Sequence, residues 1–316
     1  MSETDFFRKI LVAVNGSPIS MAAQELTASI AKNFSSKVTV MHVVSHELMN
    51  AGMQDLTLGG ADTDIPSAGI TRGDFTIPTQ LPKQPSTSPP KKMVSEITSA
   101  YREMGEQIVR NAVTSFKDEG ISVDEELVED NDPAGTIVKE AELESFDLIV
   151  IGRSSGEPEK KPHLGSLASK VARHAKLPVL ISANKNMLSK MLVPVDGSPA
   201  SKKAAKYAEA LASKIGSKVT LLFVQEQSLF NMRPKLSQEI GKKVLSTIAD
   251  QFGKTKVEQR LELGHPGKVI TRLADEENYD LVVMGSHGHS SAKRILLGNV
   301  SDQVLHYANQ AVLIVK

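Results

Sequence analysis

Three glycines near the end of the chain follow a short apolar run at the spacing G-x2-G-x9-G, and they are Gly285, Gly288 and Gly298. Glycine has no Cβ, so a backbone rich in it can approach a phosphate group closely. The residues after Gly298 are expected to begin a helix, whose first N–H groups favour an anion, and Asn299 and Ser301 add side-chain donors. The spacing therefore favours a phosphate site, although glycines that only shape turns give the same pattern. Lys293 and Arg294 lie between the second and third glycines and would add positive charge.

Asp196 is the acidic residue best placed to assist such a site. It ends the apolar run 191–195 and precedes a Gly-Ser-Pro sequence, so it is either a turn former or a ligand contact. Its place at the ligand end of a strand favours contact with a ligand. Asp147 and Asp280 instead stand before apolar runs, at the opposite end of the sheet, and are expected to be structural.

The histidines offer weaker evidence of chemistry. His287 and His289 lie two residues apart in the glycine loop, but a zinc site needs more ligands than two. We therefore expect them to face solvent or phosphate. His174 and His306 are expected to cap the C-terminal ends of helices, where a cation is favoured.

Short apolar runs alternate with helical periods throughout the chain. In the second half, Ser198 and Pro199 predict a helix start, and Gly216 predicts its end. The patterns predict strands at 191–195, 219–224, 257–263, 280–285 and 311–316, and helices at 199–215, 236–253, 266–277 and 300–308. Apolar runs without alternation, separated by helices, indicate parallel strands buried on both faces. The predicted fold class is α/β, with doubly wound domains.

The chain repeats itself. Residues 9–18 match 190–199 at an offset of 181, and residues 146–152 match 279–285 at an offset of 133. Two tandem domains follow, residues 1–184 and 185–316, each with a five-stranded, mainly parallel sheet. The change in offset predicts an insertion at about 46–92 in the first domain, read as a surface loop, a lid or a partner-docking segment.

The composition excludes several classes of protein. Lys plus Arg and Asp plus Glu both number 37, so net charge predicts neither a nucleic acid nor an anionic membrane as partner. Cysteine is absent, which excludes disulfides and thiolate chemistry. The first residues lack a secretory pattern and the apolar runs are far shorter than a membrane span, so we expect a soluble, cytoplasmic protein.

The glycine spacing and the Val-Asp strand end resemble the ATP-binding branch of the universal stress protein family, over nearly the whole chain except the insertion. The resemblance implies tandem Rossmann-like domains and ATP, with Mg²⁺ favouring the phosphates, as the ligand of the second domain. In that case Asp196 holds the ribose, Pro194 and the Val224 backbone border the adenine, and the glycine loop holds the phosphates. The full implied set is Pro194, Val195, Asp196, Val224, Met284, Gly285, His287, Gly288, Gly298, Asn299, Val300 and Ser301.

The first domain departs further from this pattern. Asn15 replaces the carboxylate, Ser155 replaces the second glycine, and Gly156 stands one residue late. Glu157 and Glu159 add negative charge beside the presumed phosphate pocket. We expect weak binding there, or none.

Three functions remain open from the sequence. The favoured one is an adenine-nucleotide-binding stress or regulatory protein, read by an unidentified protein partner. A nucleotide-free interaction scaffold is the second. A slow ATPase or nucleotidyltransferase is the third, but the sequence carries no nucleophile and base set, so no catalytic residue is assigned. The strands 178–182 and 311–316 are expected to pair the domains within the chain, leaving a homodimer optional.

Overall fold

The structure is a computed structural model that describes residues 6–45, 91–153, 164–183, 188–253, 255–288 and 297–316. The first half contains β1 (Lys9–Ala13), α1 (Pro18–Phe34), β2 (Lys37–Val44), α3 (Lys91–Asp118), β3 (Val123–Glu129), α4 (Pro133–Leu143), β4 (Leu148–Gly152), α5 (Ser166–His174) and β5 (Val179–Ser182). The second half contains β6 (Lys190–Pro194), α6 (Pro199–Ile215), β7 (Lys218–Gln225), α7 (Gln227–Met232), α8 (Pro234–Ala249), β8 (Val257–Leu263), α9 (Pro266–Glu276), β9 (Leu281–Gly285), α10 (Asn299–Tyr307) and β10 (Ala311–Val315).

The first helix of each half starts in the same way. Ser198 caps α6 by accepting a hydrogen bond from the Ser201 N–H, and Pro199 occupies the first helical position. Ser17 and Pro18 do the same for α1. Both helices end in a left-handed residue, which is Gly216 in the second half.

The helix predicted at 236–253 differs in its bounds. It begins at Pro234 and ends at Ala249, where a 3-10 turn from Asp250 to Phe252 continues the chain. A separate short helix, α7, precedes it and was not predicted. Pro234 explains the division, because proline disfavours helical geometry in the residue before it and supplies no N–H.

The strands form one continuous ten-stranded sheet in the order β3-β2-β1-β4-β5-β10-β9-β6-β7-β8. The five strands of each half are parallel, as expected, but the halves share a sheet instead of forming two separate ones. The junction is the antiparallel pair β5–β10, in register Val179↔Ile314, Leu180↔Leu313 and Ile181↔Val312. The predicted pairing through the last strands is therefore confirmed.

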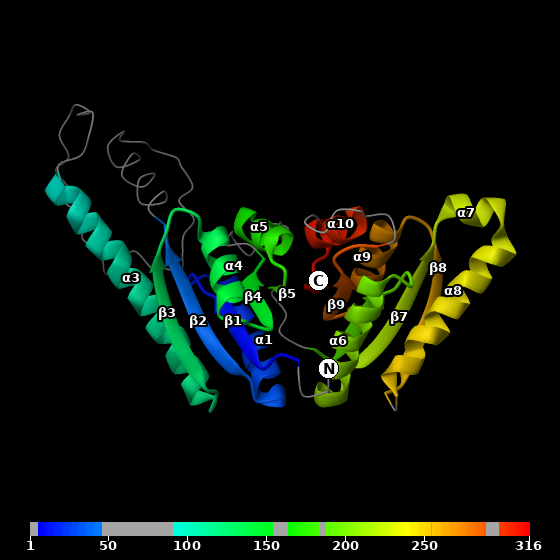
Figure 1. Cartoon of the computed structure of the whole chain (residues 1–316), viewed down its shortest axis with the longest axis horizontal. Helices are drawn as coiled ribbons and strands as arrows, with labels where there is room; N and C mark the ends of the chain where they lie inside the picture. Colours follow the sequence, from blue (N-terminus) through cyan, green and yellow to red (C-terminus); the bar gives the residue numbers. More distant parts are fainter. Residues whose placement is uncertain (1–5, 46–90, 154–163, 184–187, 254, 289–296) are drawn as a thin grey trace.

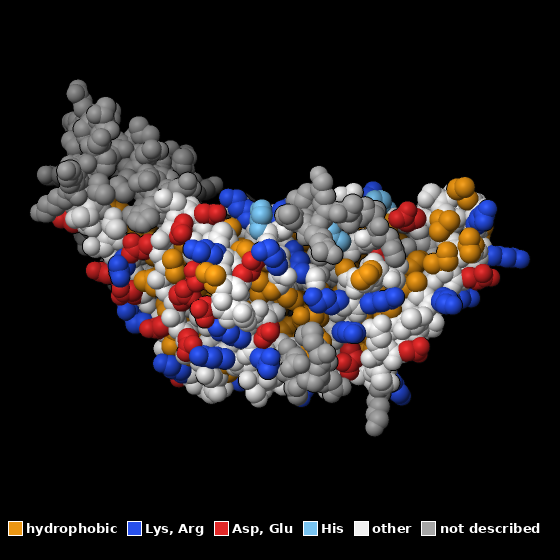
Figure 2. Space-filling view, viewed as in Figure 1, with side chains coloured by type: hydrophobic (Ala, Val, Ile, Leu, Met, Phe, Trp, Pro, Cys, Tyr) orange, Lys and Arg blue, Asp and Glu red, His pale blue; other side chains and the backbone are white. Residues whose placement is uncertain are grey.

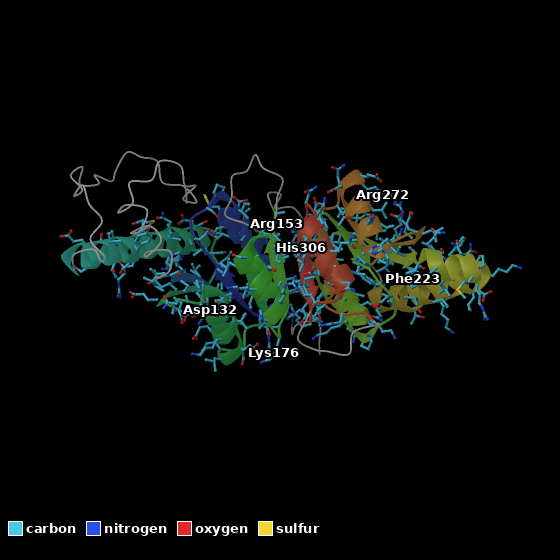
Figure 3. The ribbon with its side chains drawn as sticks, turned by 90° about the horizontal axis from the view of Figure 1, so that it is seen from above. Asp132, Arg153, Lys176, Phe223, Arg272 and His306 are labelled. Carbon is cyan, nitrogen blue, oxygen red and sulfur yellow. The ribbon has the colours of Figure 1, made fainter. Side chains whose placement is uncertain are left out.

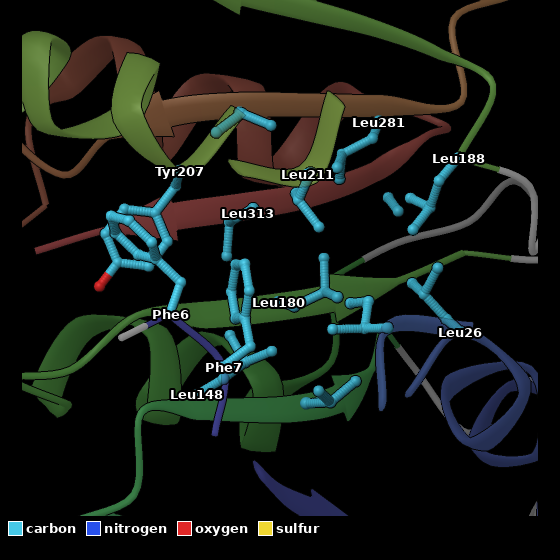
Figure 4. Packing of buried hydrophobic residues seen from close by; sticks show 14 of the residues in the cluster. Phe6, Phe7, Leu26, Leu148, Leu180, Leu188, Tyr207, Leu211, Leu281 and Leu313 are labelled. Atoms are coloured by element: carbon cyan, nitrogen blue, oxygen red, sulfur yellow. The ribbon is translucent and has the colours of Figure 1, made fainter. Parts of the chain in front are cut away.

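Helices cover both faces of the sheet, and the two halves are arranged about the β5–β10 junction (Figure 1). Alternate strand residues enter two apolar layers, so every inner strand is buried on both sides. One layer crosses the junction, where Leu180 and Leu313 are both 1% exposed and Phe6 packs on Tyr207 with ring centroids 4.7 Å apart (Figure 4). The halves thus share a core.

The outer surface is mostly polar, but exposed apolar side chains gather over α7 and α8 (Figure 2). Among the described helices, none combines the length and the apolar character that a membrane span requires. The predicted insertion at 46–92 falls outside the described residues up to residue 90, and its last two residues open α3. The domain boundary at 184/185 also falls outside them and stays a prediction.

Candidate functional site

The topological switch point of the second half lies at the C-terminal ends of β6 and β9, and this position is named the crevice. Among the described residues these strands pair only at Met191↔Leu281 and Leu192↔Val282. The corresponding strands of the first half, β1 and β4, stay paired through Val12↔Val150 and Ala13↔Ile151. Pro194 stands where the first half has Ala13, and it has no N–H to donate to β9. The strands therefore separate at the switch point, where open α/β sheets bind ligands.

Asp196 lies at the mouth of this crevice. Its Oδ1 accepts a hydrogen bond of 2.9 Å from the Ser198 N–H, which shapes the turn into α6. Its Oδ2 lies on the side of the glycine loop, where a Cβ built on Gly288 would come within 2.7 Å of it. The turn interpretation and the ligand interpretation of Asp196 thus apply to different oxygens of one carboxylate.

The absence of a Cβ has a different structural consequence at each of the three glycines. A Cβ on Gly285 would lie 2.8 Å from the backbone of Ala200, so this glycine allows α6 to pack on the end of β9. Gly288 is exposed, its φ is not in the left-handed region, and its neighbour is the Asp196 carboxylate. A Cβ on Gly298 would meet only ordinary contacts, the nearest at 3.5 Å. Gly288 is therefore the glycine that leaves space beside the acid.

The helix after the loop begins as expected. Gly298 is the N-cap of α10, and the first helical hydrogen bond runs from the Asp302 N–H to the Gly298 carbonyl. The N–H groups of Asn299, Val300 and Ser301 precede that bond and have no partner within the helix, which makes this end of α10 suited to an anion. The Ser301 hydroxyl is buried and donates to the Gly285 carbonyl at 2.8 Å, so its contribution to such a site comes from its backbone N–H.

Apolar residues and backbone groups of β7 lie near the C-terminal end of β6. Val195, after β6, and Met284, in β9, are both buried, at 5% and 4% exposure, and they lie in different apolar layers of the sheet. The Val195 N–H bonds the Leu222 carbonyl, so Leu222 faces β6. Alternate residues of a parallel strand face the same neighbour, and Val224 therefore presents its N–H and C=O beyond the last residue of β6. This geometry agrees with the expected backbone contact to a base.

His287 follows β9 inside the loop. Its Nδ1 is 2.9 Å from the Ser286 hydroxyl, and its buried Nε2 has no hydrogen-bond partner within the described residues. Burial lowers the pKa of His287, and the positive charge of Lys316 lowers it further. The ring is thus neutral at pH 7. In the part of the chain that is described, no group of three or more His, Asp or Glu residues is arranged to hold a metal ion. His289, Lys293 and Arg294 lie outside the described residues.

The corresponding position in the first half is built differently. The Asn15 Oδ1 accepts a bond of 3.1 Å from the Ser17 N–H, which forms the same turn as Asp196 without a carboxylate. His42 lies beside it, with Nδ1 2.7 Å from the Val14 carbonyl, and burial lowers the pKa of His42. Ser155, Gly156, Glu157 and Glu159 lie outside the described residues.

The structural roles expected for the two acids before the fourth strands are confirmed. Asp147 accepts from the Lys9 N–H, and Asp280 accepts from the Lys190 N–H, each at 2.9 Å, so both acids fix the start of the first strand of their half. His174 and His306 instead each bring Nδ1 within 2.8 Å of the carbonyl four residues earlier, that of Lys170 and of Asp302, so neither ring caps a terminal carbonyl of its helix as expected.

The sequence did not point to Arg153, which the structure buries completely at the junction between the halves. Its guanidinium donates to the Leu305 carbonyl at 2.5 Å and to the Gln310 carbonyl at 3.0 Å. Lys316 of the second half makes the reciprocal contact: its Nζ donates to the Ala172 carbonyl of the first half at 2.5 Å. A charged residue directly after the apolar run 148–152 is the signal that would have singled out Arg153.

A shallow hollow of about 430 Å³ lies at the outer side of α9 and α10. It is lined by His265, Asn299, Asp302, Gln303, His306 and Tyr307. Asn299 is also the first residue of α10, so the hollow reaches the N-terminal end of this helix.

The family model of the universal stress protein family matches residues 6–62, 72–182 and 187–316. A universal stress protein of Methanocaldococcus jannaschii is 32% identical over 149 residues, which is 43% of this chain and 87% of that protein. A universal stress protein of Mycobacterium tuberculosis (strain H37Rv) is 28% identical over 232 residues, 67% of this chain and 77% of that protein.

Among solved structures, a universal stress protein from Archaeoglobus fulgidus superposes with a TM-score of 0.66 at 19% identity. The match covers 98% of each chain, so the similarity in fold includes both halves.

Proposed function

Because the chain belongs to the universal stress protein family, we propose that its second half is an adenine-nucleotide-binding domain that takes ATP with Mg²⁺. The observation that carries the proposal is the early end of the β6–β9 pairing, which leaves Asp196 opposite Gly288 in an open crevice. The first half has neither the opening nor the carboxylate.

The residues fit the parts of the nucleotide. Pro194 and Val224 border the base, and the Val224 backbone supplies a donor and an acceptor. Asp196 supplies an acceptor for ribose hydroxyls. Gly288 and the first turn of α10 supply space and N–H groups for the phosphates. Mg²⁺ prefers oxygen ligands and keeps several waters, so the phosphates and water would form most of its coordination shell.

Binding of this kind serves regulation. A ligand that binds only the folded protein stabilises it, and it shifts the population toward the bound conformation. We propose that a protein partner in the cytoplasm reads that conformation.

Asp196→Asn is the sharpest test, because the first half already carries asparagine there and keeps the same turn. We expect titration calorimetry of the full chain with ATP and Mg²⁺ to show affinity lower by about tenfold in this variant, the size expected for a lost hydrogen bond to a charged group. The thermal midpoint without ligand should not change. Asp124→Asn is the matched control, since it removes a surface carboxylate of β3 that pairs with Lys37.

Each other outcome selects a different function. A wild-type chain that gives no heat and no thermal shift at millimolar ATP would support the nucleotide-free scaffold. Release of phosphate from ATP above an enzyme-free blank would support the slow ATPase. Mass spectrometry of ligand released from the denatured purified protein identifies which nucleotide, including AMP, ADP or a cyclic nucleotide, the protein carries.

A further inference from the structure

Arg153 belongs to the first half but binds a helix of the second. It directly follows β4, and its guanidinium donates to the Leu305 carbonyl in the last turn of α10 and to the Gln310 carbonyl just beyond it. Figure 3 shows Arg153 beside the labelled His306 of α10, where the halves meet. Burial lowers the pKa of Arg153 to about 10, so the side chain remains a cation at neutral pH. A cation at this end of a helix is favoured by the helix dipole.

Arg173, also from the first half, binds the opposite end of the same helix. It extends from α5, and its Nη2 donates to Oδ1 of Asp302. Asp302 lies in the first turn of α10, next to the N–H groups that precede the first helical hydrogen bond. A carboxylate there would repel a phosphate, and the Arg173 cation offsets its charge.

The helix held in this way is short. It has nine residues and is therefore about 13 Å long, so a displacement of its last turn also displaces its first turn. The corresponding helix of the first half, α5, differs in two contacts: Lys316, with one hydrogen bond, takes the place of Arg153 at its last turn, and Ser169 stands where α10 has Asp302. The guanidinium with two hydrogen bonds and the first-turn carboxylate thus both belong to the helix of the half that carries Asp196.

We propose that Arg153 and Arg173 are positioning residues for the phosphate end of the second half's nucleotide site. Arg153 fixes the axial position of α10, and Arg173 neutralises Asp302, so the first half acts as a support for a site that it does not itself form. This inference rests on the nucleotide function proposed above.

The test compares ATP with adenosine, because only ATP reaches the phosphate end. Arg153→Met keeps an unbranched side chain but removes the guanidinium. In this variant we expect the ATP affinity of the full chain to fall about tenfold while the adenosine affinity stays unchanged. In Arg173→Gln we expect a fall of about threefold, since this ion pair is partly exposed. Adding Asp302→Asn to Arg173→Gln should restore ATP affinity, because the unneutralised carboxylate is then gone.

Phe6→Leu is the matched control. It loosens the aromatic contact with Tyr207 at the same junction without touching α10. It should leave the ratio of ATP to adenosine affinity unchanged. If Phe6→Leu lowers that ratio as much as Arg153→Met does, or if the arginine variants weaken ATP and adenosine equally, the arginines are only structural and the proposal is overturned.

Hydrogen exchange of the unliganded protein separates this proposal from the nucleotide function. Arg153→Met should speed exchange of the α10 amides from Asp302 to Tyr307 more than Phe6→Leu does. A wild-type chain that binds neither ATP nor adenosine would refute the nucleotide function. Unchanged α10 exchange in Arg153→Met would refute the positioning role, whether or not nucleotide binds. If Arg153→Met fails to fold, the comparison of Arg173→Gln with Arg173→Gln/Asp302→Asn still decides the role of Arg173. Arg153→Lys then tests the role of Arg153.

Discussion

The two halves of the chain share one fold but differ in single residues at the position where a ligand would bind. Asp196 and Asn15 form the same turn, since each accepts a hydrogen bond from the N–H of the serine two residues later. They differ in charge, so only the second half offers a carboxylate. The effect of these residues on binding is therefore separable from their effect on folding.

A substitution at Gly288 tests whether the space beside the Asp196 carboxylate is needed for binding. In Gly288→Val we expect ATP affinity at least tenfold lower, because the new Cβ would lie 2.7 Å from the Asp196 Oδ2 and the methyl groups would occupy the loop. The φ of Gly288 is outside the left-handed region and the residue is exposed, so the melting temperature should stay close to that of the wild type. Unchanged ATP affinity in a normally folded variant would show that this loop does not hold phosphate.

His42 predicts a pH dependence of stability. Burial lowers its pKa in the folded protein below the ordinary value of 6.5, so the unfolded chain takes up the proton more readily. The stability is fully present above about pH 6.5 and is lost as the pH falls from there toward the folded pKa. The second half has Phe223 at this position. We expect the melting temperature to fall less between pH 7.5 and pH 5 in His42→Phe than in the wild type, and an equal fall in both would contradict this.

At the scale of elements, one proline decides where two strands separate. The β1–β4 pairing continues to Ala13, whereas the β6–β9 pairing stops at Leu192, two residues before Pro194. The Lys190 carbonyl accepts from the Asp280 N–H, so the even-numbered residues of β6, Pro194 included, face β9. Proline at 194 cannot complete the ladder there.

Pro194→Ala should restore that ladder bond and close the crevice. The gained hydrogen bond, about 1 kcal/mol, is offset by the loss of proline's restriction on the unfolded chain, so stability should change by less than about 1 kcal/mol. ATP affinity should fall, and the new amide at position 194 should be protected from hydrogen exchange. An unprotected amide at 194 would mean that Pro194 is not what separates the strands.

At the scale of the whole molecule, the central pair β5–β10 makes the two halves one body. Each last strand would be an exposed apolar edge without the other, and such edges promote aggregation. Deleting residues 311–316 removes β10 from between β5 and β9. We expect the truncated protein to aggregate or to show expanded dimensions in small-angle scattering, and a soluble protein of unchanged dimensions would contradict the shared interface.

A single substitution in β10 tests the shared interface with a smaller perturbation. Leu313 is 1% exposed and lies opposite Leu180 across the junction. Leu313→Ala should lower the free energy of unfolding by about 2–5 kcal/mol in urea titrations, in one transition that involves both halves. The control is Leu143→Ala, since Leu143 is 66% exposed and its loss should cost less than about 0.5 kcal/mol.

The sequence by itself determined the repeat, the α/β class, the parallel direction of the strands within each half and the pairing of the last strands. These follow from local information: apolar runs without alternation, serine and proline at helix starts, and matching blocks such as 9–18 and 190–199. It also selected Asp196 and the glycines, because their spacing after apolar runs is itself local. The short helix α7 was missed, since its six residues, fewer than two turns, are too few to show a period.

Only the tertiary structure decided what depends on residues far apart in the chain. It decided the antiparallel register of the expected β5–β10 pair, with Leu180 opposite Leu313 across 133 residues of sequence, and through it one continuous sheet in place of two. It assigned separate reasons to the three glycines, since Gly285 faces Ala200 and Gly288 faces Asp196. It also placed Arg153 against Leu305, 152 positions away. Hydrogen bonding and steric exclusion act over a few ångströms of space, and sequence spacing carries no record of which distant residues come within that range.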